Sequence, residues 1–303
     1  MTTDRPFLGV MLMLCFCVLA PLGDSLAKLL GGAVALAVLV FARFGVQTVL
    51  LLPLVLVMRQ GLGLPKDILA WTFVRTLLHI TGIAMMFSAL QYLPLADAIA
   101  IAFVMPFIML LLGKYVMGEE VGRQRLMACL VGFGGTLLVV QPNFVDVGWP
   151  ALLPLGVALV FALFMMVTRR IARSMDPIKL QAISGVQACI VLGIGFFLLP
   201  ALRGEGGFVL SGDVWWLLLA MGVVGTLAHL FMTWSLRFAP AATLAPMQYL
   251  EIPFATLIGW IVFGDLPDGI AAVGICITMA AGLYVIVREQ RLSRRALVAP
   301  EGV

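Results

Sequence analysis

Charged residues are scarce in this sequence. Only 11% of its 303 residues are Asp, Glu, Lys or Arg, whereas ordinary globular domains contain roughly 25%. The sequence also lacks a polar stretch long enough for a separate soluble domain, and it lacks a low-complexity linker. With a mean hydropathy of +1.13, these absences indicate a polytopic membrane protein rather than a water-soluble one.

Motifs of catalysis and metal binding are also missing. The sequence contains no H-E-x-x-H, G-x-S-x-G or G-x-x-x-x-G-K-[ST] pattern. Its two histidines, His79 and His229, are expected on different helices, with no acidic residue at metal-ligand spacing. We therefore expect no enzyme activity, no metal site, no cofactor and no ATP hydrolysis by this chain alone.

Long apolar runs are what the sequence has in abundance. About 20 apolar residues are needed to cross a bilayer core about 30 Å thick, and such runs recur between charges, prolines and glycines. We predict an all-α membrane protein with ten transmembrane helices. The predicted spans are 7–30, 35–58, 68–92, 96–117, 125–140, 151–168, 180–202, 214–238, 241–263 and 269–287.

The first apolar run could be mistaken for a secretory signal, because Arg5 precedes it and small residues such as Ala20 follow. The run is too long for a signal peptide. We therefore interpret it as the first transmembrane helix. The five cysteines all fall inside predicted helices, where they are expected to act as small apolar residues.

Basic residues are distributed unevenly between the two sides of the predicted membrane topology. With a cytoplasmic N-terminus, the outer side has only Lys28 and Arg203. Because basic loop residues remain in the cytoplasm, both termini are predicted to be cytoplasmic, and the net charge of +4 indicates topology rather than nucleic-acid binding. The basic residues on the cytoplasmic side are Arg5, Arg59, Lys66, Lys114, Arg123, Arg125, Arg169, Arg170, Arg173, Lys179, Arg237, Arg288, Arg291, Arg294 and Arg295.

Residues 89–140 and 235–286 match each other at a constant offset of 146 positions without a gap. A small-residue stripe in the first segment (Ala128, Gly132, Thr136) falls on a second stripe (Gly274, Thr278, Gly282), and such stripes let helices approach closely in lipid. The repeat predicts two five-helix halves. Because five is odd, the halves have opposite orientation, as in carriers that work by alternating access. The pairs that support the alignment are Leu90 and Leu236, Pro94 and Pro240, Gly113 and Gly259, Gly118 and Gly264, and Glu119 and Asp265.

Several segments resemble a known family. The pattern Ala-Leu-x-x-Leu-Pro-Leu-Ala-Asp-Ala at 89–98, the Gly-Glu-Glu turn at 118–120 and Ser-Leu-x-x-Ala-Pro-Ala at 235–241 are similar to the EamA type of the drug/metabolite transporter superfamily. Ala-Pro-x-x-Tyr-Leu-Glu at 245–251 and Phe-Gly-Asp-x-Pro-Asp at 263–268 resemble the branch with S-adenosylmethionine and riboflavin uptake carriers. The resemblance implies a bacterial inner-membrane metabolite carrier.

With the repeat, the resemblance implies EamA-like halves at 1–142 and 143–288, followed by a basic cytoplasmic tail at 289–303.

Four charged residues in the first half are candidates for charge pairs inside the membrane. Burying one costs roughly 2.5–3.5 kcal/mol on insertion scales, so each needs a partner, a cavity or a function. Asp24 and Lys28 lie four residues apart on one helix face and can neutralise each other, either at the headgroups or in a site. Arg43 lies too deep to reach the surface easily and needs an acidic partner, for which Asp24 and Asp97 are candidates.

Arg75 and His79 are also separated by four residues and share a helix face. Two cationic groups on one face favour a cavity-lining position, although a structural clamp and hydrogen-bonded packing stay open as alternatives. His229 occupies a comparable depth in the second half. We predict that Asp24, Arg75, His79 and His229 contribute to substrate binding.

A carboxylate occurs in the middle of the ninth apolar run. On a helix, Met247, Leu250, Glu251 and Phe254 form one face. Gln248 and Tyr249 flank this face, and Pro246 and Pro253 bracket the segment. A low-dielectric site favours the neutral form of a carboxylic acid, which suits proton binding. We predict that Glu251, with Gln248 and Tyr249, faces a central polar cavity. A protonated or arginine-paired structural role stays open.

The leading hypothesis is a secondary active transporter that moves a small organic metabolite across the inner membrane by alternating access. The expected substrate is a vitamin, a nucleoside-like or S-adenosylmethionine-like compound, or an amino-acid-like compound. The alternatives are an exporter of amino acids or drugs and a structural membrane subunit without transport activity. Proton coupling and a homodimer are options, and the expected partners are the substrate and the lipid bilayer, without nucleic acid.

Overall fold

The computed structural model describes residues 5–116, 118, 122–139, 148–199, 212–264 and 269–298. Within these residues the regular secondary structure is helical, without a β-strand, as predicted. Seven apolar helical segments are long enough to span a bilayer. Three shorter apolar helical segments cover Leu126–Gly135, Met247–Phe263 and Ala272–Tyr284. The chain is a polytopic membrane protein.

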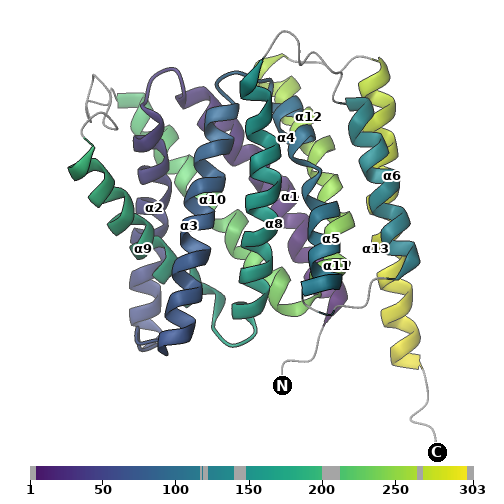
Figure 1. Ribbon diagram of the computed structural model, residues 1–303, viewed down its shortest axis with the longest axis horizontal. Helices are drawn as coiled ribbons and strands as arrows, with labels where there is room; N and C mark the ends of the chain where they lie inside the picture. Colours follow the sequence, from purple (N-terminus) through teal and green to yellow (C-terminus); the bar gives the residue numbers. More distant parts are fainter. Residues whose placement is uncertain are drawn as a thin grey trace, which may run out of the picture.

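Figure 1 shows the helices packed into one bundle, with α1 beginning and α13 ending at the same end of it. The helices are α1 (Pro6–Leu30), α2 (Leu36–Val57), α3 (Lys66–Ala89), α4 (Leu95–Ala102), α5 (Met105–Val116), α6 (Arg123–Val139), η1 (Trp149–Leu152), α8 (Leu153–Ala172), α9 (Pro177–Leu198), α10 (Gly212–Phe238), α11 (Ala241–Leu244), η3 (Ala245–Leu250), α12 (Glu251–Phe263) and α13 (Gly269–Val298).

Two predicted spans are interrupted in the structure. The span 96–117 is divided between α4 and α5, and the span 241–263 is divided among α11, η3 and α12. At both breaks a proline lies in the first turn of the following helix, Pro106 in α5 and Pro253 in α12, where its missing N–H costs no helical hydrogen bond. Pro21 and Pro53 lie inside the uninterrupted helices α1 and α2, so proline favours these breaks without requiring them.

The interruption corrects the predicted stripe on the ninth span. The stripe requires an α-helix that runs from Met247 through Phe254, but the chain is 3₁₀-helical up to Leu250 and α-helical only from Glu251. Met247 is fully buried away from Glu251's cavity. Glu251 is thus placed by the start of α12 rather than by a continuous helical face.

The helices pair in a regular pattern. Extensive contacts join α1 to α10, α3 to α8, α2 to α9, and α6 to α13. Figure 1 shows α2 and α9 at one side of the bundle and α6 and α13 at the other, with α8 between them. Glycine permits close packing in the pairs: a Cβ on Gly9 of α1 would lie 2.5 Å from Ala239 Cβ, and one on Gly82 of α3 would lie 2.5 Å from Phe161.

Small residues on α6 and α13 make two kinds of contact, one between the two helices and one with side chains of η3. The two helices approach each other where Gly135 faces the backbone of Gly274, since a Cβ on Gly135 would lie 2.8 Å from that carbonyl oxygen. Gly132 and Gly282 instead receive the side chains of Tyr249 and Leu250 from η3. The side chain of Thr136 lies outside the described part of the chain. The predicted stripe residues Gly132 and Gly282 therefore seat the interrupted segment, whereas α6 meets α13 through Gly135, which lies outside the predicted stripe.

Candidate substrate cavity

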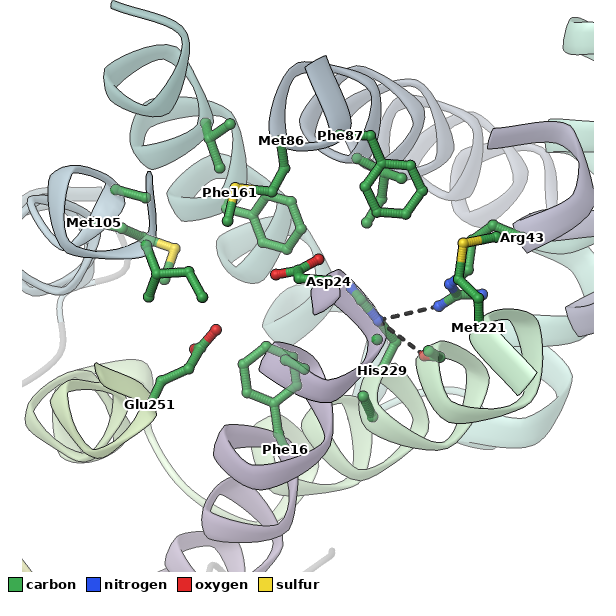
Figure 2. A pocket seen from close by; sticks show the side chains of 18 of the residues that line it. Phe16, Asp24, Arg43, Met86, Phe87, Met105, Phe161, Met221, His229 and Glu251 are labelled. Atoms are coloured by element: carbon green, nitrogen blue, oxygen red, sulfur yellow. Dashed lines mark hydrogen bonds between the residues drawn. The ribbon is translucent and has the colours of Figure 1, made fainter. Parts of the chain in front are cut away.

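A cavity of about 70 Å³ lies in the centre of the bundle. The cavity is large enough to hold several waters. Its wall is mainly apolar, with four Phe and three Met side chains, and it includes four ionisable groups, Asp24, Arg43, His229 and Glu251, which Figure 2 labels. The lining residues are Phe16, Ala20, Gly23, Asp24, Arg43, Ile83, Met86, Phe87, Ile99, Ala102, Phe103, Met105, Val157, Phe161, Met221, Gly225, Ala228, His229 and Glu251.

Asp24 extends from α1 into this cavity. It forms no hydrogen bond or ion pair with any residue that the structure describes, so the expected pair with Lys28 is not formed. Lys28 instead donates to the backbone oxygen of Leu93 at 2.9 Å, and its Nζ lies 5.1 Å from the ring centre of Phe263. The four-residue spacing places the two charges on one helix, but their side chains turn to different neighbours.

Glu251 is 8% exposed and occupies the first position of α12. Its carboxylate points into the cavity in Figure 2. Among the described residues it has no hydrogen-bond or ion-pair partner. Asp24 lies close enough that the two carboxylates repel each other when both are ionised. The cavity thus contains two acidic groups that compete to carry negative charge, an arrangement in which binding one proton relieves the repulsion.

Arg43 of α2 is only 2% exposed and has neutral hydrogen-bond partners. Its Nη1 donates to Gln47 Oε1 at 3.1 Å and to Thr226 Oγ1 at 3.4 Å, and its Nη2 lies 3.2 Å from His229 Nδ1. Asp24, one of the two proposed acidic partners, is not hydrogen-bonded to Arg43, whose described partners are an amide, a hydroxyl and an imidazole. Asp24 attracts the guanidinium only from a greater distance.

The side chain of Asp97, the second proposed acidic partner of Arg43, lies outside the described part of the chain. Its partnership with Arg43 stays a prediction.

The Nδ1 atom of His229 on α10 lies near two groups that require it in opposite hydrogen-bonding roles. Its Nδ1 lies 3.0 Å from the oxygen of Gly225 and 3.2 Å from Arg43 Nη2. Nδ1 either donates to Gly225 or accepts from Arg43, since one ring nitrogen cannot do both. In either tautomer Nε2 has no hydrogen-bond partner among the described residues. His229 therefore offers an unused polar atom next to the cavity.

Arg75 and His79 are fully buried and do not appear among the described residues of the cavity wall. Arg75 donates to Thr168 at 2.9 Å, to Ser184 at 2.8 Å and to Thr233 at 3.5 Å, so it joins α3 to α8, α9 and α10. The ring of His79 lies against that of His229, with ring centres 4.3 Å apart and the planes tilted by 37°. The two residues share a face of α3 as predicted, but they form the layer behind the cavity.

Gln248 and Tyr249 also lie behind the wall. Both are fully buried. The Tyr249 hydroxyl donates to the backbone oxygen of Cys129 at 3.0 Å, and its ring lies 5.6 Å from that of Phe103; Gln248 Nε2 donates to Met165 Sδ. These contacts position η3, so in this structure the two side chains support the cavity without lining it.

Sequence reasoning did not identify the polar network behind Arg43. Gln47 donates from Nε2 to the oxygens of Gln181 at 2.8 and 3.3 Å, and Gln181 donates to Thr233 at 3.1 Å. Spacing provided a signal: Gln47 lies four residues after Arg43. Thr226 and Thr233 similarly flank His229 on one face of α10. Nor did it identify Phe16, Phe87 and Phe161, which are indistinguishable from lipid-facing aromatics in a sequence.

The EamA-like transporter family model matches this chain twice, at residues 7–141 and 148–288. A riboflavin transporter of Rhizobium johnstonii is 27% identical, with 78% of this chain and 77% of the relative covered. The pseudopaline exporter CntI of Pseudomonas aeruginosa is 27% identical, with 89% and 90% covered. An S-adenosylmethionine uptake transporter of Rickettsia prowazekii is 23% identical, with 93% and 94% covered.

A solved structure described as "Crystal structure of protein" has a TM-score of 0.69 to this chain at 21% identity, covering 94% of this chain and 97% of that one. It shows a shared fold. The two family matches cover nearly all of the helical bundle, and the resemblance read from the sequence motifs agrees with them. The chain belongs to the EamA-like transporter family of the drug/metabolite transporter superfamily.

Proposed function

We propose that this chain is a secondary active carrier that moves a small organic metabolite across the bacterial inner membrane by alternating access. Its ten membrane crossings form two inverted halves, 1–142 and 143–288, with both termini and the tail at 289–303 in the cytoplasm. Helix pairing supports two symmetry-related halves. When each helix is replaced by its counterpart in the other half, the α1–α10 contact becomes the α8–α3 contact, and α2–α9 and α6–α13 each map onto themselves.

The interrupted helices support the same symmetry. Phe103 precedes α5 and Tyr249 precedes α12; the two residues are 146 positions apart in the sequence, and their rings are in contact. Discontinuous helices that meet at the interface between inverted repeats are a common way to build a substrate site near the bilayer midplane.

The observation that carries the proposal is the central cavity with two carboxylates, Asp24 and Glu251, that have no hydrogen-bond partner among the described residues. Unpaired acidic groups inside a membrane are costly, and the cavity has room for water that delivers protons to them. Asp24, His229 and Glu251 form the substrate and proton site. Arg75, His79, Gln248 and Tyr249 support it from behind and become accessible when the halves rock.

The named relatives favour a vitamin or nucleoside-like metabolite, because riboflavin and S-adenosylmethionine are the compounds in their names. Another named relative is an exporter, so the direction of net flux is a separate question. In a proton-coupled carrier, the direction of net flux is set by the gradients and not by the fold. A carrier of this design runs either way, according to the gradients of solute and protons.

Transport against pH in membrane vesicles tests the proposal. Right-side-out and inside-out vesicles, with and without the protein, are incubated with riboflavin, with S-adenosylmethionine and with a bacterial metabolite extract, and accumulated solutes are identified by mass spectrometry. We expect at least one solute to accumulate, faster when its source compartment is acidic. Glu251→Gln keeps the volume of a neutral Glu but cannot ionise, so the pH dependence should disappear and transport should fall at least tenfold.

Asp67→Asn is the matched control, because it removes an exposed carboxylate at the start of α3 and should transport like wild type. Absence of accumulation in both vesicle orientations would contradict a carrier. Equal rates and pH profiles for wild type and Glu251→Gln would show that this carboxylate is structural.

A further inference from the structure

The guanidinium of Arg43 is a buried charge next to the substrate cavity without a carboxylate in hydrogen-bond contact among the described residues. Arginine stays protonated in proteins, so its charge must be compensated. The partners that the structure provides, Gln47, Thr226 and His229, supply oxygen and nitrogen lone pairs but no negative charge. A guanidinium has five N–H donors in a planar fork, and these contacts use only part of them.

The second buried arginine adds to the positive charge on this side of the cavity. Arg75 is fully buried, and its hydrogen-bond acceptors among the described residues are three hydroxyl groups. No carboxylate among the described residues contacts it. The ionisable side chains described around the region are Cys17 and Asp24 on α1, Arg43 on α2, Arg75 and His79 on α3, His229 on α10, Tyr249 on η3 and Glu251 on α12.

The acidic groups occupy a different part of the cavity. Figure 2 shows Asp24 between Glu251 on one side and Arg43 on the other. Asp24 is within electrostatic reach of both. When Asp24 is ionised it partly compensates Arg43, and when Asp24 takes a proton the charge of Arg43 is left without compensation. An anion that enters the cavity with that proton restores the balance.

We infer that Arg43 binds an acidic group of the transported solute, a carboxylate or a phosphate, while protonation of Asp24 opens the site to it. This rests on the proposed transport function and defines its substrate class as organic acids with an apolar or aromatic body. The body is accommodated by Phe16, Phe161 and the other aromatic and Met side chains of the wall. Solute and proton then cross together, since an ionised Asp24 repels the acid from Arg43.

Geometry fixes the guanidinium in this position. Gly225 of α10 lies directly beneath it, and a Cβ at that position would collide with the Arg43 side chain. His229 Nε2 adds a polar atom without a partner among the described residues. In the tautomer where Nδ1 accepts from Arg43, Nε2 carries the proton and is a second donor for the acidic group.

The test uses the full chain in liposomes of phosphatidylethanolamine and phosphatidylglycerol. The probe is a bacterial metabolite extract supplemented with two matched series: indole-3-acetate, tryptamine and tryptophol, and riboflavin 5′-phosphate with riboflavin. Mass spectrometry sorts the accumulated solutes by charge. We expect wild type to accumulate solutes with a carboxylate or phosphate, faster from an acidic source compartment, and Asp24→Asn to lose that pH dependence for the same solutes.

Variants locate the site. At matched amounts of folded protein, Arg43→Gln should reduce accumulation of the acidic solutes at least tenfold, and Arg43→Lys, which keeps the charge but loses the fork, should retain part of it. Arg170→Gln removes the same charge from an exposed position over Trp71 and should behave like wild type.

The outcomes of this transport experiment distinguish the acid site from the carrier function. Accumulation by wild type of only neutral or cationic solutes would overturn the acid site and leave the carrier function standing, and this readout does not depend on whether a variant folds. Undiminished accumulation of acidic solutes by Arg43→Gln would also overturn the site. Accumulation of no solute at all would remove the proposed function and the acid site with it.

Discussion

At the scale of single residues, the position of Arg43 depends on the absence of a Cβ atom at Gly225. Gly225 has no side chain, and the guanidinium lies in the space that a methyl group would fill. Gly222, one turn earlier on the same helix, leaves similar space for Val46. These glycines are required for close approach rather than for an unusual backbone conformation, because both lie within the regular helix α10.

We predict that Gly225→Ala displaces the Arg43 side chain from Thr226 and His229. Overpacking of this kind costs typically 1–3 kcal/mol, so the thermal unfolding temperature in detergent should fall and transport should weaken. Gly193→Ala is the control, because a Cβ there meets nothing within 4 Å; it should leave both measurements unchanged or raise stability slightly. Equal behaviour of the two variants would show that Arg43 does not need this space.

At the scale of helices, the interrupted segments set the shape of the cavity. η3 is held against α6 by the Tyr249 hydroxyl on Cys129 and by the Tyr249 ring on Gly132, where a Cβ would lie 2.5 Å from the ring. Because η3 leads directly into α12, this seat also fixes Glu251 at the cavity. The position of Glu251 at the start of α12 thus depends on how Tyr249, two residues earlier, packs against α6.

We predict that Gly132→Ala unseats Tyr249 and shifts the start of α12. Transport should fall, with a loss of stability of about 1–3 kcal/mol from overpacking, measured by thermal unfolding and vesicle uptake. Gly134→Ala changes the neighbouring glycine of the same helix, which has nothing within 4 Å of its added methyl group. If Gly134→Ala impaired the protein as much as Gly132→Ala, general disturbance of α6 would explain the result instead of Tyr249.

At the scale of the whole molecule, the charge asymmetry of the loops and the predicted odd number of helices per half favour the same topology, with both chain ends in the cytoplasm. Both described chain ends, at the start of α1 and the end of α13, lie at the same end of the bundle in Figure 1. An even number of crossings agrees with that arrangement. Which end faces the cytoplasm rests on the basic residues alone.

Cysteine labelling in intact cells measures the topology. In a variant without the five native cysteines, new cysteines near Asn143, Glu205 and Asp268 should react with a membrane-impermeant maleimide added outside. Cysteines near Arg123, Ser174 and Arg294 should react only after the membrane is permeabilised. External labelling near Ser174 would reverse the orientation.

Much of the architecture follows from the sequence alone. The length of apolar runs is a local property, so seven of the ten predicted spans agree with single helices of the structure within a few residues, and an eighth agrees at its start while its helix runs on to Val298. The intramembrane acids Asp24 and Glu251 were recognisable in the same way, because a charge inside an apolar run is costly wherever the helix packs.

Tertiary structure decided which polar side chains meet. Arg43 hydrogen-bonds to Thr226 and His229, which lie 183 and 186 positions away in the sequence, and no spacing rule specifies such a contact. Arg75 and His79 share a helix face with similar chemistry, yet the packing of α3 against α8 and α10 places them behind the wall. Helix periodicity determines which residues share a face of one helix. The rotation and approach of neighbouring helices, set by side-chain packing across the whole bundle, determine whether that face meets the cavity, another helix or lipid.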